Sequence, residues 1–325
     1  MTGSAGFIGS NLCATLLACG QDVIGIDNFS NGYWENIRWI EELAGDFKRS
    51  SFQFVEGDIR DPKFTDTFTA LADIVLHQAA LGSVPRSIAN PVASFESNVV
   101  GFHNLVDSAR RMKHPPRLVF ASSSSVYGDS PNLPKVEGQE GNPLSPYAMT
   151  KHFDEKIGQT YSRVFGLPII GLRYFNVFGP RQKREGPYAA VIPLWISALL
   201  QRQGVNVNGD GSNSRDFTFI ANVVQANLLA ALTPNETCFG EIFNIAAGGR
   251  TTLLDILDKI ISNLKEQKAI QQDPVVQFGP PRAGDVPHSL ASIEKASKQL
   301  QYSPLFSVDD GIRETVKWFA ANTSY

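Results

Sequence analysis

The chain has 325 residues, of which 42% are apolar and 19% are charged. A chain of this length can bury roughly three quarters of the surface that its unfolded form exposes, so a globular protein is expected and a disordered tail, a coiled coil or a collagen is excluded. The formal net charge of −3 gives no broad attraction to nucleic acid or anionic lipid, which makes a small molecule the expected partner.

Cysteine usage and the apolar runs bear on the compartment. Cys13, Cys19 and Cys238 are an odd number without a pairing pattern, which favours a reducing compartment. No stretch reaches the roughly 18 apolar residues of a membrane span, and the N-terminus lacks the basic flank and apolar run of a secretion signal. We therefore expect a cytoplasmic protein with no membrane segment and no nucleic-acid partner.

The first half of the sequence alternates short β-branched runs with segments of helical periodicity. This alternation predicts an α/β fold, in which helices cover a doubly wound parallel sheet of the Rossmann type. Ile8, Leu12 and Leu16 share one face of a helix predicted over residues 7–18, and Gly20 is its expected stop. The predicted strands are residues 22–27, 52–57, 74–77, 117–121 and 168–173.

The pattern changes after Asn176, where turns rich in Gly, Pro and Asn replace the regular alternation. We expect a first domain over residues 1–175, joined by a return segment near 217–246, and a smaller α/β lobe over 176–325. Within the second half, the pattern predicts a strand at 243–246, a helix at 253–264 and a Pro/Gly-rich loop at 279–287.

The sequence begins with Met1, Thr2 and Gly3, so the strand that should lead into the first glycine turn is almost entirely missing. In a doubly wound sheet that strand is central. Its loss is expected to leave the neighbouring strands unpaired and to make the stability of the chain doubtful.

A glycine-rich turn opens the first helix. Gly3, Gly6 and Gly9 recur at three-residue spacing, and glycine allows backbone N–H groups to approach a pyrophosphate at a helix N-terminus. The same spacing also suits a simple tight turn. Asp27 ends the next strand, as expected of an acid that binds the adenosine ribose and favours NAD over NADP, although it could instead cap the turn at 28–32.

A tyrosine and a lysine stand four residues apart downstream. Pro146 is well placed to begin a helix, so Tyr147 and Lys151 share one face. A lysine ammonium beside a tyrosine favours the phenolate, which can act as a general base. A neighbouring pair on the surface is the alternative, but the serines at 122–125 follow the strand at 117–121 and mark a strand end where such sheets bind ligands.

Other chemistries lack their motifs. The five histidines show no metal-ligand spacing, so no metal is expected. Neither the Gly-x-Ser-x-Gly turn of hydrolases nor a Gly-Lys-Ser/Thr phosphate loop occurs, which leaves oxidation and reduction with NAD as the expected chemistry.

Four motifs occur together: the glycine turn at 3–9, the strand end at 122–127, Tyr147-x-x-x-Lys151, and Arg-Tyr-Phe-Asn-Val-Phe-Gly-Pro at 173–180. Together they resemble the extended short-chain dehydrogenase/reductases that act on nucleotide sugars, over essentially the whole chain. Within that family, which includes the UDP-glucose/galactose 4-epimerases, segments 77–87 and 189–193 are similar to the UDP-N-acetylglucosamine 4-epimerases of surface-polysaccharide synthesis.

The resemblance implies roles for individual residues. It places Tyr147, Lys151, Ser123 and Ser124 in catalysis, with Ser123 bound to the reacting O4. It implies cofactor contacts, besides Tyr147 and Lys151, from Gly3, Gly6, Phe7, Ile8, Gly9, Asp27, Asn28, Asp58, Ile59, Asn98 and Tyr174. It implies contacts to the UDP-sugar from Gly82, Ser83, Arg86, Asn176, Gln182, Ala190, Val191, Asn206, Arg215, Arg282, Asp285 and Ser289. Arginines suit a pyrophosphate because they are permanently charged donors.

Two positions discriminate among relatives. The 4,6-dehydratases have Thr-Asp-Glu where this chain has Ser123, Ser124 and Ser125, so the carboxylates needed for dehydration are missing. Epimerases restricted to unmodified hexoses have a tyrosine at the position of Ser289, and a serine there leaves room for an N-acetyl group. Asn206 stands where close relatives can have an aromatic residue near the uracil.

These features predict NAD-dependent 4-epimerisation of UDP-N-acetylglucosamine to UDP-N-acetylgalactosamine through a 4-keto sugar. A UDP-glucose or UDP-glucuronate-type 4-epimerase or decarboxylase on the same scaffold is the nearest alternative. A non-catalytic NAD-binding protein is an alternative from another class, because fold alone does not determine function. The resemblance also implies a homodimer.

Overall fold

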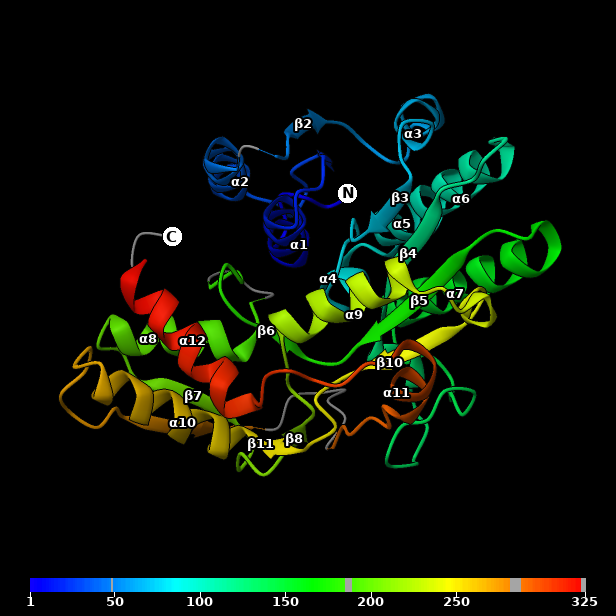
Figure 1. Ribbon diagram of the computed structural model, residues 1–325. Coiled ribbons are helices and arrows are strands. Elements are labelled where there is room, and N and C mark those ends of the chain that lie inside the picture. Colours follow the sequence, from blue (N-terminus) through cyan, green and yellow to red (C-terminus); the bar gives the residue numbers. More distant parts are fainter. Residues whose placement is uncertain (48, 185–188, 281–287, 323–325) are drawn as a thin grey trace.

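The computed structural model describes residues 1–47, 49–184, 189–280 and 288–322. It confirms the predicted α/β class, with parallel strands covered by helices (Figure 1). Each predicted strand, and both helices predicted at 7–18 and 253–264, are present with boundaries shifted by at most two residues. The strands of the larger sheet are β1 (Val23–Asp27), β2 (Phe52–Glu56), β3 (Ile74–His77), β4 (Arg117–Ser123), β5 (Ile169–Tyr174) and β10 (Ile242–Ile245).

The sheet is bridged at its middle by the first residues of the chain. β1 pairs with β2, and the remaining strands run in the order β10, β5, β4, β3, all parallel. Thr2 forms a bridge both to Ile26 of β1 and to His77 of β3. The Thr2 amide donates to Leu76 O at 3.1 Å, and Ile26 N donates to Met1 O at 2.8 Å. The backbone groups near the carboxyl ends of β1 and β3 are therefore paired, and the expected loss of pairing does not reach the glycine turn.

Helices cover both faces of this sheet because alternate strand residues point to opposite sides. Leu118 and Phe120 of β4 pack beneath α6 and α7, while Val119 joins Leu12 of α1 in the cluster on the other face. The helices around the sheet are α1 (Phe7–Ala18), α2 (Trp34–Asp46), α3 (Pro62–Thr69), α4 (Val84–Ala89), α5 (Pro91–Phe95), η1 (Glu96–Val100), α6 (Gly101–Arg111), η2 (Ser124–Tyr127), α7 (Pro146–Phe165), α9 (Ile220–Leu232) and η3 (Glu236–Cys238).

A second group of elements, drawn at the lower left of Figure 1, holds most of the residues after Asn176. Among its described residues are three short pairs of strands: β7 with β12 and β6 with β9 in parallel, and β8 with β11 antiparallel. These elements are β6 (Val177–Phe178), α8 (Val191–Leu200), β7 (Val205–Asn208), β8 (Ser214–Arg215), β9 (Thr218–Phe219), β11 (Thr251–Thr252), α10 (Leu253–Glu266), β12 (Val276–Gly279) and α12 (Val308–Ala321). α11 (Glu294–Leu300) instead packs against β10 and α9, beside the larger sheet.

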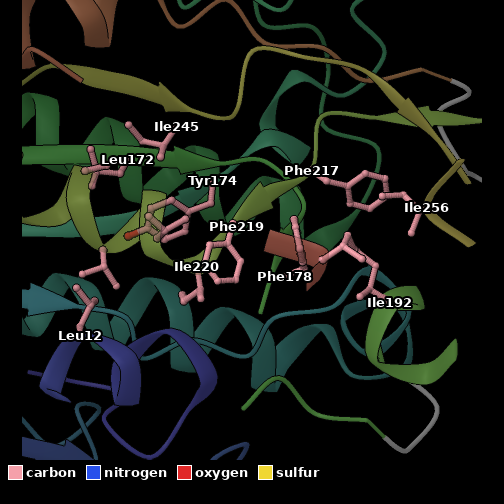
Figure 2. Packing of buried hydrophobic residues seen from close by; sticks show 14 of the residues in the cluster. Leu12, Leu172, Tyr174, Phe178, Ile192, Phe217, Phe219, Ile220, Ile245 and Ile256 are labelled. Atoms are coloured by element: carbon pink, nitrogen blue, oxygen red, sulfur yellow. The ribbon is translucent and has the colours of Figure 1, made fainter. Parts of the chain in front are cut away.

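One apolar core joins the two groups. Figure 2 shows Leu12 of α1 and Tyr174 of β5 in the same cluster as Phe219 of β9 and Ile256 of α10. Burying these side chains together stabilises the fold and fixes the second group beside the carboxyl ends of the strands. Among the described helices, none is long and apolar enough to cross a membrane.

Candidate active site

The glycine turn places open backbone donors at the start of α1. Gly6 precedes the helix, and no side chain caps the first turn. Gly3 has a φ of +71°, in the left-handed region that favours glycine, and a Cβ at Gly9 would lie 2.0 Å from Gly3 O. Only glycine fits at these two positions. The uncapped N–H groups and the positive end of the helix dipole together suit an anionic ligand.

Asp27 both supports the turn and lines the cleft beside it. Its carboxylate accepts from Ala5 N at 3.0 Å and from Phe29 N at 2.8 Å. Burial raises the pKa of Asp27, while its bonds to backbone amides oppose the rise. The capping role that the sequence left open is therefore present. The carboxylate has unused lone pairs and lines the cleft, so capping and a ribose contact are compatible.

A cleft of about 250 Å³ runs from the glycine turn to the start of α7. It gathers most of the residues predicted to contact a cofactor, which are far apart in the sequence. Those that line it are Gly3, Gly6, Phe7, Ile8, Gly9, Asp27, Asn28, Ile59, Tyr147, Lys151 and Tyr174. Gly82, from the predicted substrate set, lines it as well. In the sequence, each of these positions alone is a weak indication of a cofactor site. Their meeting in one cleft is what supports a common site.

Two predicted cofactor residues, Asp58 and Asn98, do not line the cleft themselves but contact residues that do. Asp58 accepts from Asn28 Nδ2 at 2.9 Å, and its pair with Arg60 lowers the pKa of Asp58 to about 2. Asn98 is fully buried, and its Oδ1 accepts from Leu81 N at 2.7 Å. Both side chains hold residues that line the cleft, because Asn28 and Leu81 are lining residues.

Tyr147 and Lys151 lie one helical turn apart on α7, and both face the cleft. Ser145 caps this helix by accepting from Ala148 N at 3.1 Å, and Pro146 occupies its first turn. Lys151 is only 2% exposed. Its Nζ donates to Ala121 O at 3.0 Å and to Asp154 Oδ2 at 3.1 Å. An ammonium has three donors, so one remains for a group in the cleft.

The serines follow β4 directly. Ser122 Oγ donates to Glu155 Oε1 at 2.6 Å, while Ser123 accepts from Ser125 N at 3.2 Å and caps η2. Ser124 begins η2. Glu155 in turn receives Arg173 Nε at 2.7 Å in a buried ion pair. This network, which sequence reasoning missed, fixes the strand end beside α7.

Tyr174 at the end of β5 is held by two amide side chains. Gln78 Nε2 donates to its hydroxyl at 3.1 Å, and Asn227 Nδ2 donates at 2.8 Å. Burial raises the pKa of Tyr174 to about 12. Tyr174 therefore stays protonated near neutral pH, and its hydroxyl is engaged by these two amide groups.

The predicted substrate residues next to the first cleft lie around α4. Ser83 caps this helix by accepting from Arg86 N at 3.3 Å, and it has a φ of +111°. Arg86 donates to Asn31 Oδ1 at 3.0 Å. Asn31 lines the cleft, so Arg86 connects α4 to its edge.

The remaining predicted substrate residues belong to the second group of elements. Asn176 donates to Asp216 O at 3.0 Å, Gln182 donates to Val177 O at 2.9 Å, and Asn206 O receives Trp195 Nε1 at 3.0 Å. Ala190 and Val191 form the start of α8. Arg215 lies on β8, next to Ser214, whose O receives Ser289 N at 3.0 Å. Arg282 and Asp285, and most of the Pro/Gly loop predicted at 279–287, lie outside the described residues.

Asp216 is a buried carboxylate that carried no signal in the sequence beyond its neighbour Arg215. It accepts from Ala247 N at 3.0 Å and from Ala291 N at 3.2 Å. Burial raises the pKa of Asp216 to about 6. This carboxylate joins the segment after β10 and the segment before α11 to its own, so its contacts are structural ones to backbone amides. In the described part of the chain, no three His, Cys, Asp or Glu side chains gather to hold a metal ion.

Comparison with known proteins gives a consistent result. The model of the NAD dependent epimerase/dehydratase family matches residues 1–246. The chain is 33% identical over 320 residues to UDP-glucose 4-epimerase of Mycolicibacterium smegmatis, covering 98% of this chain and 97% of that protein. It is 31% identical over 336 residues to UDP-glucuronate 4-epimerase 4 of Arabidopsis thaliana, covering 98% and 74%. Among solved structures, UDP-N-acetylglucosamine 4-epimerase of Methanobrevibacter ruminantium M1, in complex with UDP-N-acetylmuramic acid, superposes with a TM-score of 0.88 at 34% identity, covering 99% and 97%.

Proposed function

This chain belongs to the NAD dependent epimerase/dehydratase family, and from that premise we propose that it inverts C4 of UDP-N-acetylhexosamines. The broader activity is that of an NAD-dependent UDP-sugar 4-epimerase. The observation that carries the proposal is that Tyr147 and Lys151 open into the same cleft as the glycine turn. The product pair would be UDP-N-acetylglucosamine and UDP-N-acetylgalactosamine, as precursors for surface polysaccharide.

The residues of the cleft fit NAD. The tight approach of Gly9 to Gly3 and the uncapped start of α1 suit a pyrophosphate, and Asp27 suits a ribose hydroxyl while it disfavours a 2′-phosphate. In this proposal residues 1–175, with the return segment near 217–246, hold NAD, and residues 176–325 hold the UDP-sugar. Bound NAD would supply a reversible hydride acceptor at C4 of the sugar.

The protein's own residues would handle the proton. Tyr147 takes the proton of the O4 hydroxyl as C4 loses hydride, which leaves a 4-keto sugar. The keto sugar turns over, C4 regains hydride on its other face, and Tyr147 returns the proton to O4. The cycle is redox-neutral. Ser123, at the end of β4, would hydrogen-bond O4 and orient it, with Ser124 beside it.

Lys151 would bind and orient rather than transfer the proton. Its ammonium is fixed by Ala121 O and Asp154, and its remaining donor can reach a ribose hydroxyl or the tyrosine oxygen. A positive charge at this place favours the Tyr147 phenolate that accepts the proton.

The preference for an N-acetylated sugar rests on small residues. Ser289, whose backbone is anchored to Ser214, would leave room for the acetamido group. Gly82, Ala190 and Gln182 would line the pocket that holds the sugar. Asn176, Asn206, Arg215, Arg282 and Asp285 would hold the UDP moiety, and Ser83, Arg86 and Val191 would complete the pocket.

The product assay tests this proposal. Purified protein given UDP-N-acetylglucosamine without added NAD should yield UDP-N-acetylgalactosamine until the two reach equilibrium, as followed by proton NMR. UDP-glucose and UDP-glucuronate are the competing substrates. A Ser289→Tyr variant should lose at least tenfold in kcat/KM for the N-acetylated sugar relative to UDP-glucose, because the larger side chain fills the space for the acetamido group. An unchanged preference would contradict the role of Ser289. Turnover of UDP-glucuronate alone would favour the uronate epimerase, and binding without turnover would favour a non-catalytic protein.

We also propose that the protein is a homodimer. Exposed apolar side chains gather on the adjoining helices α4, α5 and α7, including Ile88, Val92, Phe95 and Phe153. Patches of this kind on soluble proteins mark interfaces. Sedimentation equilibrium should give twice the chain mass of 35.5 kDa, and Phe153→Glu should shift it toward the mass of one chain. A single-chain mass for the unmodified protein at micromolar concentration would refute the dimer.

A further inference from the structure

Asp154 is a fully buried carboxylate on α7, three residues after Lys151. Its Oδ2 lies 3.1 Å from Lys151 Nζ, and both side chains are at most 2% exposed. Its Oδ1 has no hydrogen-bond partner in the part of the chain that the structure describes. A buried ion pair contributes little to net stability, because desolvation of the two charges offsets their attraction. Stability alone therefore does not explain why a carboxylate is buried beside Lys151.

The surroundings leave Lys151 as the main partner of Asp154. On α7 itself, Lys151 and Glu155 are the charged groups whose fields act on Asp154, and Glu155 is engaged by Ser122 and Arg173. Burial raises the pKa of Asp154 to about 7, and the charge of Lys151 opposes the rise, so Asp154 is a carboxylate in the alkaline range in which tyrosines ionise. His77 of β3 is buried and neutral, since burial and then Lys151 lower its pKa to about 3.

The titratable groups on the other elements that pack against α7 interact with residues other than Asp154. Arg86 of α4 contacts Asn31, Glu96 of η1 contacts Arg60, His103 of α6 contacts Tyr161, Asp107 of α6 contacts Arg110, Arg117 of β4 donates to Ala231 O, and Tyr127 of η2 donates to Asn244. Among the residues that the structure describes, Asp154 is the one carboxylate that forms an ion pair with Lys151.

We propose that Asp154 is a positioning residue, which holds the Lys151 ammonium against Ala121 O and offsets part of its charge at Tyr147. The ammonium is then held by a carboxylate and a carbonyl, and its third donor remains for a group in the cleft, which Lys151 lines. Asp154 itself lies outside the residues that line the cleft, so it acts from behind Lys151, by holding the ammonium and by its own charge. The inference rests on the proposed role of Tyr147 but on no particular sugar.

The effect is measurable on the protein without substrate. Asp154 follows Tyr147 by seven residues, which is roughly 10 Å along a helix. At that distance, and with the effective dielectric typical of proteins, a unit charge changes a protonation midpoint by about one pH unit. Removing the carboxylate takes away its negative charge while Ala121 O still holds the ammonium. The uncompensated charge of Lys151 should then favour the Tyr147 phenolate, which should form at lower pH.

The experiment is a pH titration of tyrosinate absorbance in NAD-bound protein, with the Tyr147 signal defined as the difference from Tyr147→Phe. In Asp154→Asn the midpoint should move down by about one unit. Lys156→Gln removes an exposed charge on the same helix and should leave the midpoint in place, because solvent screens that charge. An unchanged or higher midpoint in folded Asp154→Asn would overturn the proposal. If that variant does not fold, Asp154→Ser supplies the same measurement.

A double-mutant cycle tests whether the effect of Asp154 on the Tyr147 midpoint depends on Lys151. In a Lys151→Met background, Asp154 has lost its cation and its buried carboxyl group takes up a proton, so Asp154→Asn should cause no further shift. A shift of equal size in that background would mean that Asp154 stays ionised and affects Tyr147 without Lys151, and the proposed dependence of Asp154 on Lys151 would be wrong. Because no sugar is present, failure here is distinguishable from failure of the epimerase assay.

Discussion

Tyr147→Phe should give a folded protein that retains NAD and turns over UDP-sugar about a thousandfold more slowly, which is within the usual contribution of general acid–base catalysis. The change removes one hydroxyl group from a partly buried ring at the start of α7, so packing is preserved. Tyr174, the other tyrosine of the cleft, cannot take over the proton, because burial raises its pKa to about 12 and two amide groups hold its hydroxyl. Steady-state kinetics with the NMR product assay would measure the loss.

A matched control exists on the same helix. Tyr161 lies on α7, away from the lining of the cleft, and its hydroxyl contacts His103 Nε2 at 3.0 Å on the exposed side. Tyr161→Phe removes the same hydroxyl from the same helix and should keep turnover within twofold of the unmodified protein. Turnover of Tyr147→Phe within fivefold of the unmodified protein would rule out its role as the proton acceptor.

Gly9→Ala should lower the NAD retained on purification by more than tenfold. A Cβ at this position would lie 2.0 Å from Gly3 O and 2.7 Å from Gly3 C, which are backbone atoms of the turn itself. The turn would have to open, and the N–H groups at the start of α1 would leave the position that suits a pyrophosphate. The nucleotide released by denaturing the purified protein, quantified by chromatography, measures the effect, and circular dichroism checks the fold.

Gly45→Ala is the corresponding change near the last turn of α2, at the opposite end of that helix from Asn36, which bonds to the glycine turn. Gly45 is exposed near the end of α2, and nothing lies within 4 Å of the position its Cβ would take. This variant should retain NAD fully and gain about 0.5–1 kcal/mol of stability from the better helix propensity of alanine. If Gly9→Ala retained as much NAD as Gly45→Ala, the glycine turn would not be the pyrophosphate site.

Local features of the fold followed from the sequence because they depend on neighbouring residues. The helix at 7–18 was predicted with the observed boundaries, since its apolar spacing and the flanking glycines act within a few residues. Tyr147 and Lys151 were placed on one helical face for the same reason, because the helical repeat alone brings positions four apart together. At Asp27 the sequence left two roles open, and the structure shows the capping bonds together with a place in the cleft.

The pairing of the first residues was harder to foresee. A central strand reduced to Met1 and Thr2 predicted unpaired neighbours, yet these residues bond to both β1 and β3 at the end of the sheet that carries the glycine turn. Backbone pairing is satisfied residue by residue, so even a very short segment can complete the sheet where it lies.

By itself, the sequence determined the α/β class, the glycine turn and the Tyr147 and Lys151 pair, all of which depend on short-range periodicity. Only the tertiary structure decided which buried charges meet. Glu155 pairs with Arg173 eighteen residues later and with Ser122 thirty-three residues earlier, and Asp154 is enclosed beside Lys151 by packing against the sheet. Whether a carboxylate is solvated or buried against a cation depends on the elements that close over it, and sequence spacing carries no information about that enclosure.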